Sequence, residues 1–102
     1  MQAKMWNKRF WIEISDERFL RWEYEKLLRD SGFKIISLQE HQFQPYGYTA
    51  LFLLAESHFA IHTFPECGKA YCELSSCVRK YFNRFIKLAK ERNLEGYDEI
   101  QK

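Results

Sequence analysis

Side chains that can do nucleophilic and acid–base chemistry gather in the second half of the chain. Glu56, Ser57 and His58 are consecutive and directly follow an apolar run. His62 comes five residues after Ser57, and Cys77 comes twenty residues after it. This stretch therefore offers a hydroxyl, imidazoles, a carboxylate and a thiol, the groups that covalent catalysis with proton transfer uses. Because Ser–His pairs at short spacing also arise by chance, the residue types alone leave an ordinary structural role open.

The elements that must position these residues can be predicted from hydrophobic periodicity. Extended runs rich in aromatic and β-branched residues predict strands at 10–14, 33–38, 48–56, 57–64 and 69–75. Apolar residues at helical spacing predict amphipathic helices at 16–30 and from Val78 onward. Asp16 offers a capping oxygen for the first helix, and Gly32 ends it.

This order of elements predicts the fold class. A strand, a helix, three or four strands and a second helix indicate an α+β fold, a two-layer α/β sandwich. Its sheet is mostly antiparallel, with two helices on one face. The other face is left apolar and aromatic, and an uncovered face of that kind usually finds a partner. We therefore expect a dimer.

Composition excludes several classes of protein. The 102 residues contain no repeat or linker and fit a single domain, 1–102. A net charge of +2 argues against a nucleic-acid partner. No apolar run approaches the roughly 20 residues of a membrane helix, and the N-terminus has no apolar signal core. We therefore expect a cytoplasmic protein with reduced thiols and no membrane contact. The spacing of Cys67, Cys72 and Cys77 fits a zinc site poorly, so we predict no metal.

Residues 54–66, Leu-Ala-Glu-Ser-His-Phe-Ala-Ile-His-Thr-Phe-Pro-Glu, resemble the core motif of the short prokaryotic S-adenosylmethionine decarboxylases. The family pattern is Ala-Glu-Ser-His, then Ile-His-Thr-Trp-Pro-Glu, then a Cys twenty residues after the Ser, which is Cys77 here. The upstream segment 41–47 also looks like the family's, and the resemblance runs from about residue 8 to residue 77. Members of this family are pyruvoyl enzymes of polyamine synthesis.

The resemblance implies that the chain is a zymogen that cleaves itself between Glu56 and Ser57. Ser57 Oγ attacks the Glu56 carbonyl, and elimination and hydrolysis then convert Ser57 into a pyruvoyl group. The products are a β chain, residues 1–56, and an α chain, residues 57–102, that begins with pyruvoyl. His62 maps to the base for proton transfer in processing. Thr49 maps to a supporting hydroxyl, where the family usually has Ser.

The resemblance also implies the reaction of the mature enzyme, the decarboxylation of S-adenosylmethionine to the aminopropyl donor for spermidine biosynthesis. The pyruvoyl carbonyl forms a Schiff base with the substrate amine and acts as an electron sink. Cys77 maps to the proton donor. Phe43 and Phe64 map to rings that stack on the substrate, and Glu66 maps to a carboxylate that holds its ribose. Family sites lie where two protomers meet, which implies a homodimer.

Departures from the pattern keep alternatives open. The usual Asp-x-Phe-Thr-Cys-Gly ending is Glu-Leu-Ser-Ser-Cys-Val at 73–78, and the Trp of the second motif is Phe64. The same cofactor acting on another amino acid, ornithine or arginine, is one alternative. A homologue that does not process and serves as a regulatory or binding subunit is another. Ser57 and His62 are an odd number apart, so a regular strand would place them on opposite faces, whereas the resemblance implies that they lie near each other. We therefore also expect a bend or irregular turn at Ser57.

Overall fold

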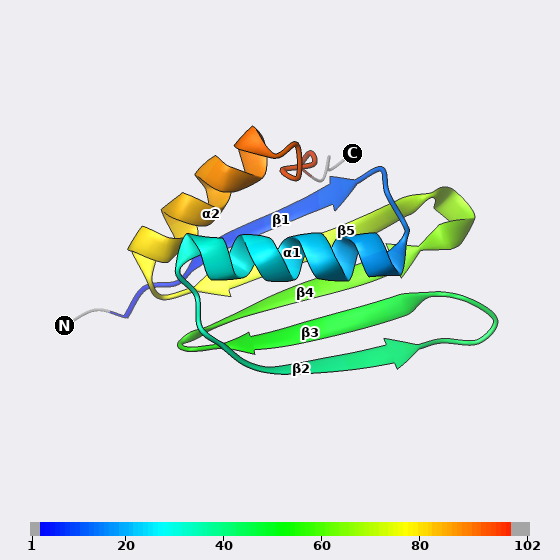
Figure 1. Cartoon of the computed structure of the whole chain (residues 1–102), viewed down its shortest axis with the longest axis horizontal. Coiled ribbons are helices and arrows are strands. Elements are labelled where there is room, and N and C mark those ends of the chain that lie inside the picture. The colour runs from blue at the N-terminus through cyan, green and yellow to red at the C-terminus, as the bar shows by residue number, and fades with distance from the viewer. Residues whose placement is uncertain (1–2, 99–102) are drawn as a thin grey trace.

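The structure, a computed structural model, describes residues 3–98 and consists of one antiparallel sheet with both helices on the same face (Figure 1). The strands are β1 (Trp6–Ile12), β2 (Ile35–Gln42), β3 (Tyr48–Leu54), β4 (Ser57–Phe64) and β5 (Lys69–Ser76). The helices are α1 (Glu17–Ser31), the short 3-10 helix η1 (Pro65–Cys67) and α2 (Arg79–Glu91). Strand order is β1-β5-β4-β3-β2, and every neighbouring pair is antiparallel. The predicted α+β two-layer sandwich is confirmed, with four strands after the first helix.

Helix α1 begins and ends where its sequence predicts. The Asp16 side chain accepts a hydrogen bond from the Phe19 backbone N–H at 3.0 Å, which satisfies one donor of the first turn. Gly32 ends the helix in the left-handed region with φ 109°. A Cβ at Gly32 would lie only 2.7 Å from the Tyr81 ring, so glycine also permits the close approach of α2. The contact between the two helices thus depends on the residue that stops the first one.

The core lies between the sheet and the helices and explains the burial pattern of β4. Phe59 and Ile61 are fully buried, because alternate residues of a strand point to the same face. The Phe59 ring lies 5.2 Å from the ring of Tyr24 on α1 and 5.6 Å from that of Phe85 on α2. Tyr24 donates a hydrogen bond from its hydroxyl to the Leu94 carbonyl, so its buried polar group is satisfied. These contacts hold β4, the central strand, in place.

The opposite face of the sheet, called here the open face, has no helix over it. Its strand register aligns side chains in three rows: Trp11–Tyr71–His62–Thr49–His41, Arg9–Glu73–Ala60–Leu51–Gln39, and Asn7–Ser75–His58–Leu53–Ser37. Leu51 and Leu53 are about half exposed, but charged and amide side chains stand among them. The expectation of an apolar and aromatic face is therefore wrong in part, since polar residues alternate with the rings. No helix within residues 3–98 is long and apolar enough to cross a membrane.

Candidate active site

A tight turn joins β3 to β4 and carries the predicted cleavage site. Leu54 pairs with Ser57, so Ala55 and Glu56 alone make the turn. Glu56 has φ 60°, in the left-handed region that residues with a Cβ adopt at a cost on the order of 1–2 kcal/mol. The Ser57 hydroxyl lies 2.6 Å from the Glu56 carbonyl oxygen, within hydrogen-bond distance. A potential nucleophile is thereby held against the preceding peptide carbonyl, at a strained residue.

Cys77 contacts the same carbonyl from the end of β5. Its backbone N–H donates to the Glu56 carbonyl oxygen at 3.3 Å, and its thiol Sγ lies 3.1 Å from that oxygen. The thiol is exposed and unpaired. Hydrogen-bond donors aimed at a carbonyl oxygen can stabilise the negative charge that develops there when the carbonyl carbon is attacked. The structure therefore brings together Glu56, Ser57 and Cys77.

Ser76 completes this group and was not predicted as a site residue. It is directly opposite Ser57 in the β4–β5 register, and the two hydroxyl oxygens lie 2.7 Å apart. Ser76 is fully buried. The sequence offered one signal, the unusual Ser-Ser before Cys77, but only the strand register reveals the contact. Glu56, Ser57, Ser76 and Cys77 are called the scissile cluster below.

His62 and Thr49 form a second group. They are a cross-strand pair of β3 and β4, and Thr49 Oγ1 lies 3.0 Å from His62 Nδ1. The His62 ring also stacks on Tyr71, with ring centroids 6.2 Å apart. Trp11 packs on the other side of Tyr71, at 5.3 Å between ring centroids. His62 is thus fixed by one hydrogen bond and one ring contact, and the neighbouring aromatic residues were not predicted.

The remaining predicted residues surround His62 and Thr49 at a cavity. Phe43, Phe64 and Glu66 help to line a hollow of about 370 Å³ together with the loop that joins β2 to β3. Both rings are partly exposed, and Glu66 is exposed in η1. A cavity of this size is within the usual range for small-molecule sites. Phe43, Thr49, His62, Phe64 and Glu66 are called the cavity cluster below.

The two clusters lie at opposite ends of β4, so the expectation that Ser57 and His62 come together is wrong, although the expected irregular turn is present just before Ser57. β4 pairs in unbroken register with both neighbours from Ser57 to Phe64. Five residues of strand separate Ser57 and His62 by about 16 Å, and they point to opposite faces of the sheet. Only the turn before Ser57 is irregular, at Glu56. Within one chain, the structure does not bring the predicted nucleophile to the predicted processing base.

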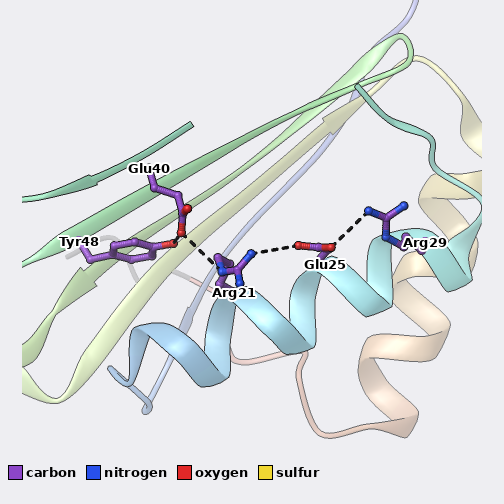
Figure 2. A network of polar contacts seen from close by, with 5 residues as sticks. All are labelled: Arg21, Glu25, Arg29, Glu40 and Tyr48. Carbon is purple, nitrogen blue, oxygen red and sulfur yellow. Dashed lines mark hydrogen bonds and ion pairs between the residues drawn. The ribbon is translucent and has the colours of Figure 1, made fainter. Parts of the chain in front are cut away.

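A polar network fixes one wall of the cavity to helix α1 (Figure 2). The Tyr48 hydroxyl donates to Glu40, and Arg21 Nε lies 3.5 Å from the same carboxylate. Arg21 and Arg29 both contact Glu25 along α1, at 3.3 and 3.2 Å. Burial, followed by the hydrogen bond to Glu40, raises the pKa of Tyr48, which therefore stays neutral. Tyr48 also borders the cavity and precedes Thr49, so this network lies next to the cavity cluster.

Comparison with known proteins points to one family. A family model described as S-adenosylmethionine decarboxylase matches residues 12–94. Proteins described as S-adenosylmethionine decarboxylase proenzyme from Prochlorococcus marinus (strain MIT 9211) and Synechococcus sp. (strain WH7803) are 39% and 42% identical to it. These matches cover 65% and 64% of this chain but 54% and 51% of those proteins, so the chain spans about half their length.

Two further matches cover more of the chain. A proenzyme of the same description from Thermotoga petrophila is 33% identical over 99 residues, which is 85% of this chain and 76% of that protein. The crystal structure of the adenosylmethionine decarboxylase from Aquifex aeolicus VF5 superposes with a TM-score of 0.69 at 23% identity. That match covers 100% of this chain and 98% of the other, and it shows that the fold is shared.

Proposed function

This chain belongs to the S-adenosylmethionine decarboxylase family, and we propose that it is a self-processing proenzyme whose mature form decarboxylates S-adenosylmethionine. The product is the aminopropyl donor for spermidine biosynthesis. The observation that carries the proposal is the contact of Ser57 Oγ with the Glu56 carbonyl group at the strained turn. The free thiols Cys67, Cys72 and Cys77 support a reducing, cytoplasmic setting.

The geometry of the scissile cluster supports self-cleavage. Ser57 Oγ bonds to the Glu56 carbonyl carbon while the bond from that carbon to the Ser57 nitrogen breaks, and the hydroxyl proton ends on the nitrogen. Cys77 donates to the carbonyl oxygen as it gains negative charge. A base then removes the Ser57 Cα proton, the Cβ–Oγ bond breaks, and Glu56 leaves as a carboxylate. Water hydrolyses the resulting dehydroalanine and releases ammonia, which leaves pyruvoyl at position 57.

The residues around position 57 fit a pyruvoyl group. The group supplies a carbonyl that accepts electrons from the bond broken in decarboxylation. The fit rests on Ser57 itself, which has the hydroxyl that becomes a leaving group and lies beside a strained peptide bond. Cys77, exposed and already against the Glu56 carbonyl, is the proton donor for the reaction. The thiol reaches the cleavage site with no rearrangement of β5.

The cavity cluster supplies the substrate end of the site. Phe43 and Phe64 present partly exposed rings, which can stack on an adenine base and attract a sulfonium cation. The exposed Glu66 can accept hydrogen bonds from ribose hydroxyls. His62, oriented by Thr49, is the processing base. Aromatic stacking and one carboxylate match the chemistry of a nucleoside sulfonium better than that of ornithine or arginine.

A homodimer is needed if both clusters serve one reaction. In a single chain, Ser57 and His62 are about 16 Å apart and on opposite faces. The open face has no helix over it, and sheets pack face to face about 10 Å apart. The two copies could be related by a two-fold axis that runs across the strands, along the row Arg9–Glu73–Ala60–Leu51–Gln39. The strands of the second copy would then run in the opposite direction to those of the first. The His62 row of each copy would then lie over the His58 row of the other, near the backbone of Ser57 and on the face opposite its hydroxyl.

The alternatives receive less support. The curated relatives reported above are all described as S-adenosylmethionine decarboxylase proenzymes, which does not favour ornithine or arginine as substrate. A chain that does not process would have no need of a nucleophile and donors on the same strained carbonyl. The same mass measurement separates this last alternative from the proposal.

Intact mass under denaturing, reducing conditions tests the proposal. We expect two fragments, 1–56 and 57–102, the second with no free amine and with a carbonyl that reacts with hydrazines. Ser57→Ala should remain a single chain, while Ser37→Ala, a change on the polar edge strand, should cleave normally. The processed protein should release CO₂ from carboxyl-labelled S-adenosylmethionine but not from ornithine or arginine. A chain that stays intact after long incubation would contradict self-processing.

A further inference from the structure

We infer that Ser76 is a positioning residue for self-cleavage, which holds the Ser57 hydroxyl in the orientation for attack on Glu56. This inference rests on the proposed function and gives a role to a residue that the comparison with the family motif left without one. Ser76 lies directly opposite Ser57 in the sheet, with 2.7 Å between the two hydroxyl oxygens. Ser76 is fully buried, so water does not compete for this contact.

The orientation of Ser76 is itself fixed by the backbone. The Val78 N–H donates to Ser76 Oγ at 2.9 Å, and the Ser76 hydroxyl lies 3.3 Å from the Val78 carbonyl oxygen. Both contacts are at the junction of β5 and α2, whose first turn has no other side-chain cap. A hydroxyl oxygen has one proton and two lone pairs. Because Ser76 donates its own proton to the Val78 carbonyl oxygen, it has a lone pair free to accept a hydrogen bond from the Ser57 hydroxyl.

The direction of that proton decides whether Ser57 can attack. Ser57 has one hydroxyl proton but two acceptors in reach, the Glu56 carbonyl oxygen at 2.6 Å and Ser76 Oγ at 2.7 Å. When the proton points to the Glu56 carbonyl oxygen, the two groups form an ordinary hydrogen bond and the Ser57 lone pairs point away from the carbonyl carbon. A proton directed at Ser76 turns the Ser57 lone pairs toward the Glu56 carbonyl carbon. Ser76 therefore favours the reactive orientation, and it keeps its own proton throughout.

The rest of the chain offers no substitute for this contact. Among residues 3–98, Ser76 is the one side chain hydrogen-bonded to Ser57 Oγ. His62 of the same chain is about 16 Å away. The Cys77 donors act on the carbonyl oxygen of Glu56 and leave the Ser57 hydroxyl unoriented. Orientation of the nucleophile in the acyl shift thus falls to Ser76.

A pair of isosteric variants tests the inference. Ser76→Thr and Ser76→Val add the same bulk to the strand and differ only in the hydroxyl. We expect the Thr variant to cleave at close to the normal rate, and the Val variant to cleave roughly three- to tenfold more slowly than Thr, the effect of one hydrogen bond. Ser76→Ala removes the hydroxyl without added bulk and should be slowed similarly. Ser31→Ala removes another fully buried serine hydroxyl, one that donates to the Leu27 carbonyl and not to the scissile cluster, and should cleave normally.

Hydroxylamine identifies the step, because it cleaves the ester that the acyl shift produces. If Ser76 acts on the acyl shift, the Val variant stays slower than the Thr variant when hydroxylamine is present. Equal rates in hydroxylamine, or equal rates of Thr, Val and Ala variants without it, would overturn the role of Ser76 and leave self-processing intact. If the protein without any substitution stays uncleaved even in hydroxylamine, the proposed function is overturned, and this inference with it. Thermal unfolding of each variant checks that it is folded. If the Val variant does not fold, the cleavage rate of the Ala variant tests the role of Ser76 instead.

Discussion

At the scale of single residues, the three cysteines differ in how exposed their thiols are. Cys67 and Cys77 are exposed, whereas Cys72 is fully buried between the sheet and the helices. Burial raises the pKa of the Cys72 thiol, so it stays protonated and inert. At about pH 8, near the ordinary thiol pKa, we expect iodoacetamide to label Cys67 and Cys77 in the folded protein and all three thiols in denaturant. Peptide mass mapping checks the sites, and rapid labelling of Cys72 in the folded state would contradict its burial.

The same raised pKa predicts how stability depends on pH. A group whose pKa is higher in the folded state favours the folded protein while it stays protonated, and this contribution is lost as pH rises above its unfolded value. For Cys72 that value is about 8.5, so the free energy of unfolding should fall between about pH 8.5 and 10. The slope due to this thiol is up to about 1.4 kcal/mol per pH unit. Urea unfolding of Cys72→Ala should show a smaller slope than the unmodified protein, whatever its stability at neutral pH.

At the scale of elements, the Tyr48 hydroxyl, which links β3 to β2, should stabilise this hairpin more than the ion pair from Arg21 on α1 does. Tyr48 is buried and donates to Glu40, whereas Arg21 and Glu40 form a largely exposed ion pair (Figure 2). Tyr48→Phe should therefore lower the free energy of unfolding by about 1 kcal/mol, and Arg21→Gln by less than about 0.5 kcal/mol. Urea unfolding measures both. A larger loss for Arg21→Gln would show that the ion pair, and not the Tyr48 hydroxyl, holds the hairpin.

Local periodicity predicted the elements but not all their limits. β4 and the start of α2 match because their buried residues recur at regular spacing. The first strand was expected at 10–14 but is Trp6–Ile12, since Asn7 and Arg9 belong to the open face and give no apolar signal. β2 likewise extends to Gln42 through polar residues of an edge strand. Polar strand positions are recognised only once their partners are known.

The grouping of the site residues was even harder to predict from local sequence than the ends of the strands. The family resemblance implied that Ser57 and His62 act together, but the strand register sets them at opposite ends of β4. The register also created two polar side-chain pairs of the site, Ser57 with Ser76 and Thr49 with His62. Each pair joins different strands, so no spacing rule within one strand could predict it. The residue types could be read from the sequence, whereas their grouping required the fold.

At the scale of the whole molecule, that grouping makes a prediction about two copies. If the open faces of two copies meet, His62 of one chain approaches the backbone of Ser57 of the other, where it can act as the base for the Ser57 Cα proton. Ser57→Ala lacks the nucleophile and His62→Ala lacks the base, so neither should form the pyruvoyl fragment when expressed alone. Co-expressed with different tags, they form mixed dimers in which the His62→Ala chain still has Ser57 and faces an intact His62. That chain alone should be cleaved.

Mass measurement of each tagged chain shows which of the two chains is cleaved. Random pairing makes about half of the dimers mixed, so up to about half of the His62→Ala chains should appear as fragment 57–102 without a free amine. Co-expression of the Ser57→Ala chain with itself controls for cleavage by other proteases. If the His62→Ala chain is cleaved equally well alone, His62 is not the base. If it stays whole in mixed dimers of verified composition, His62 must act within its own chain, which would require β4 to break its register with β3 and β5.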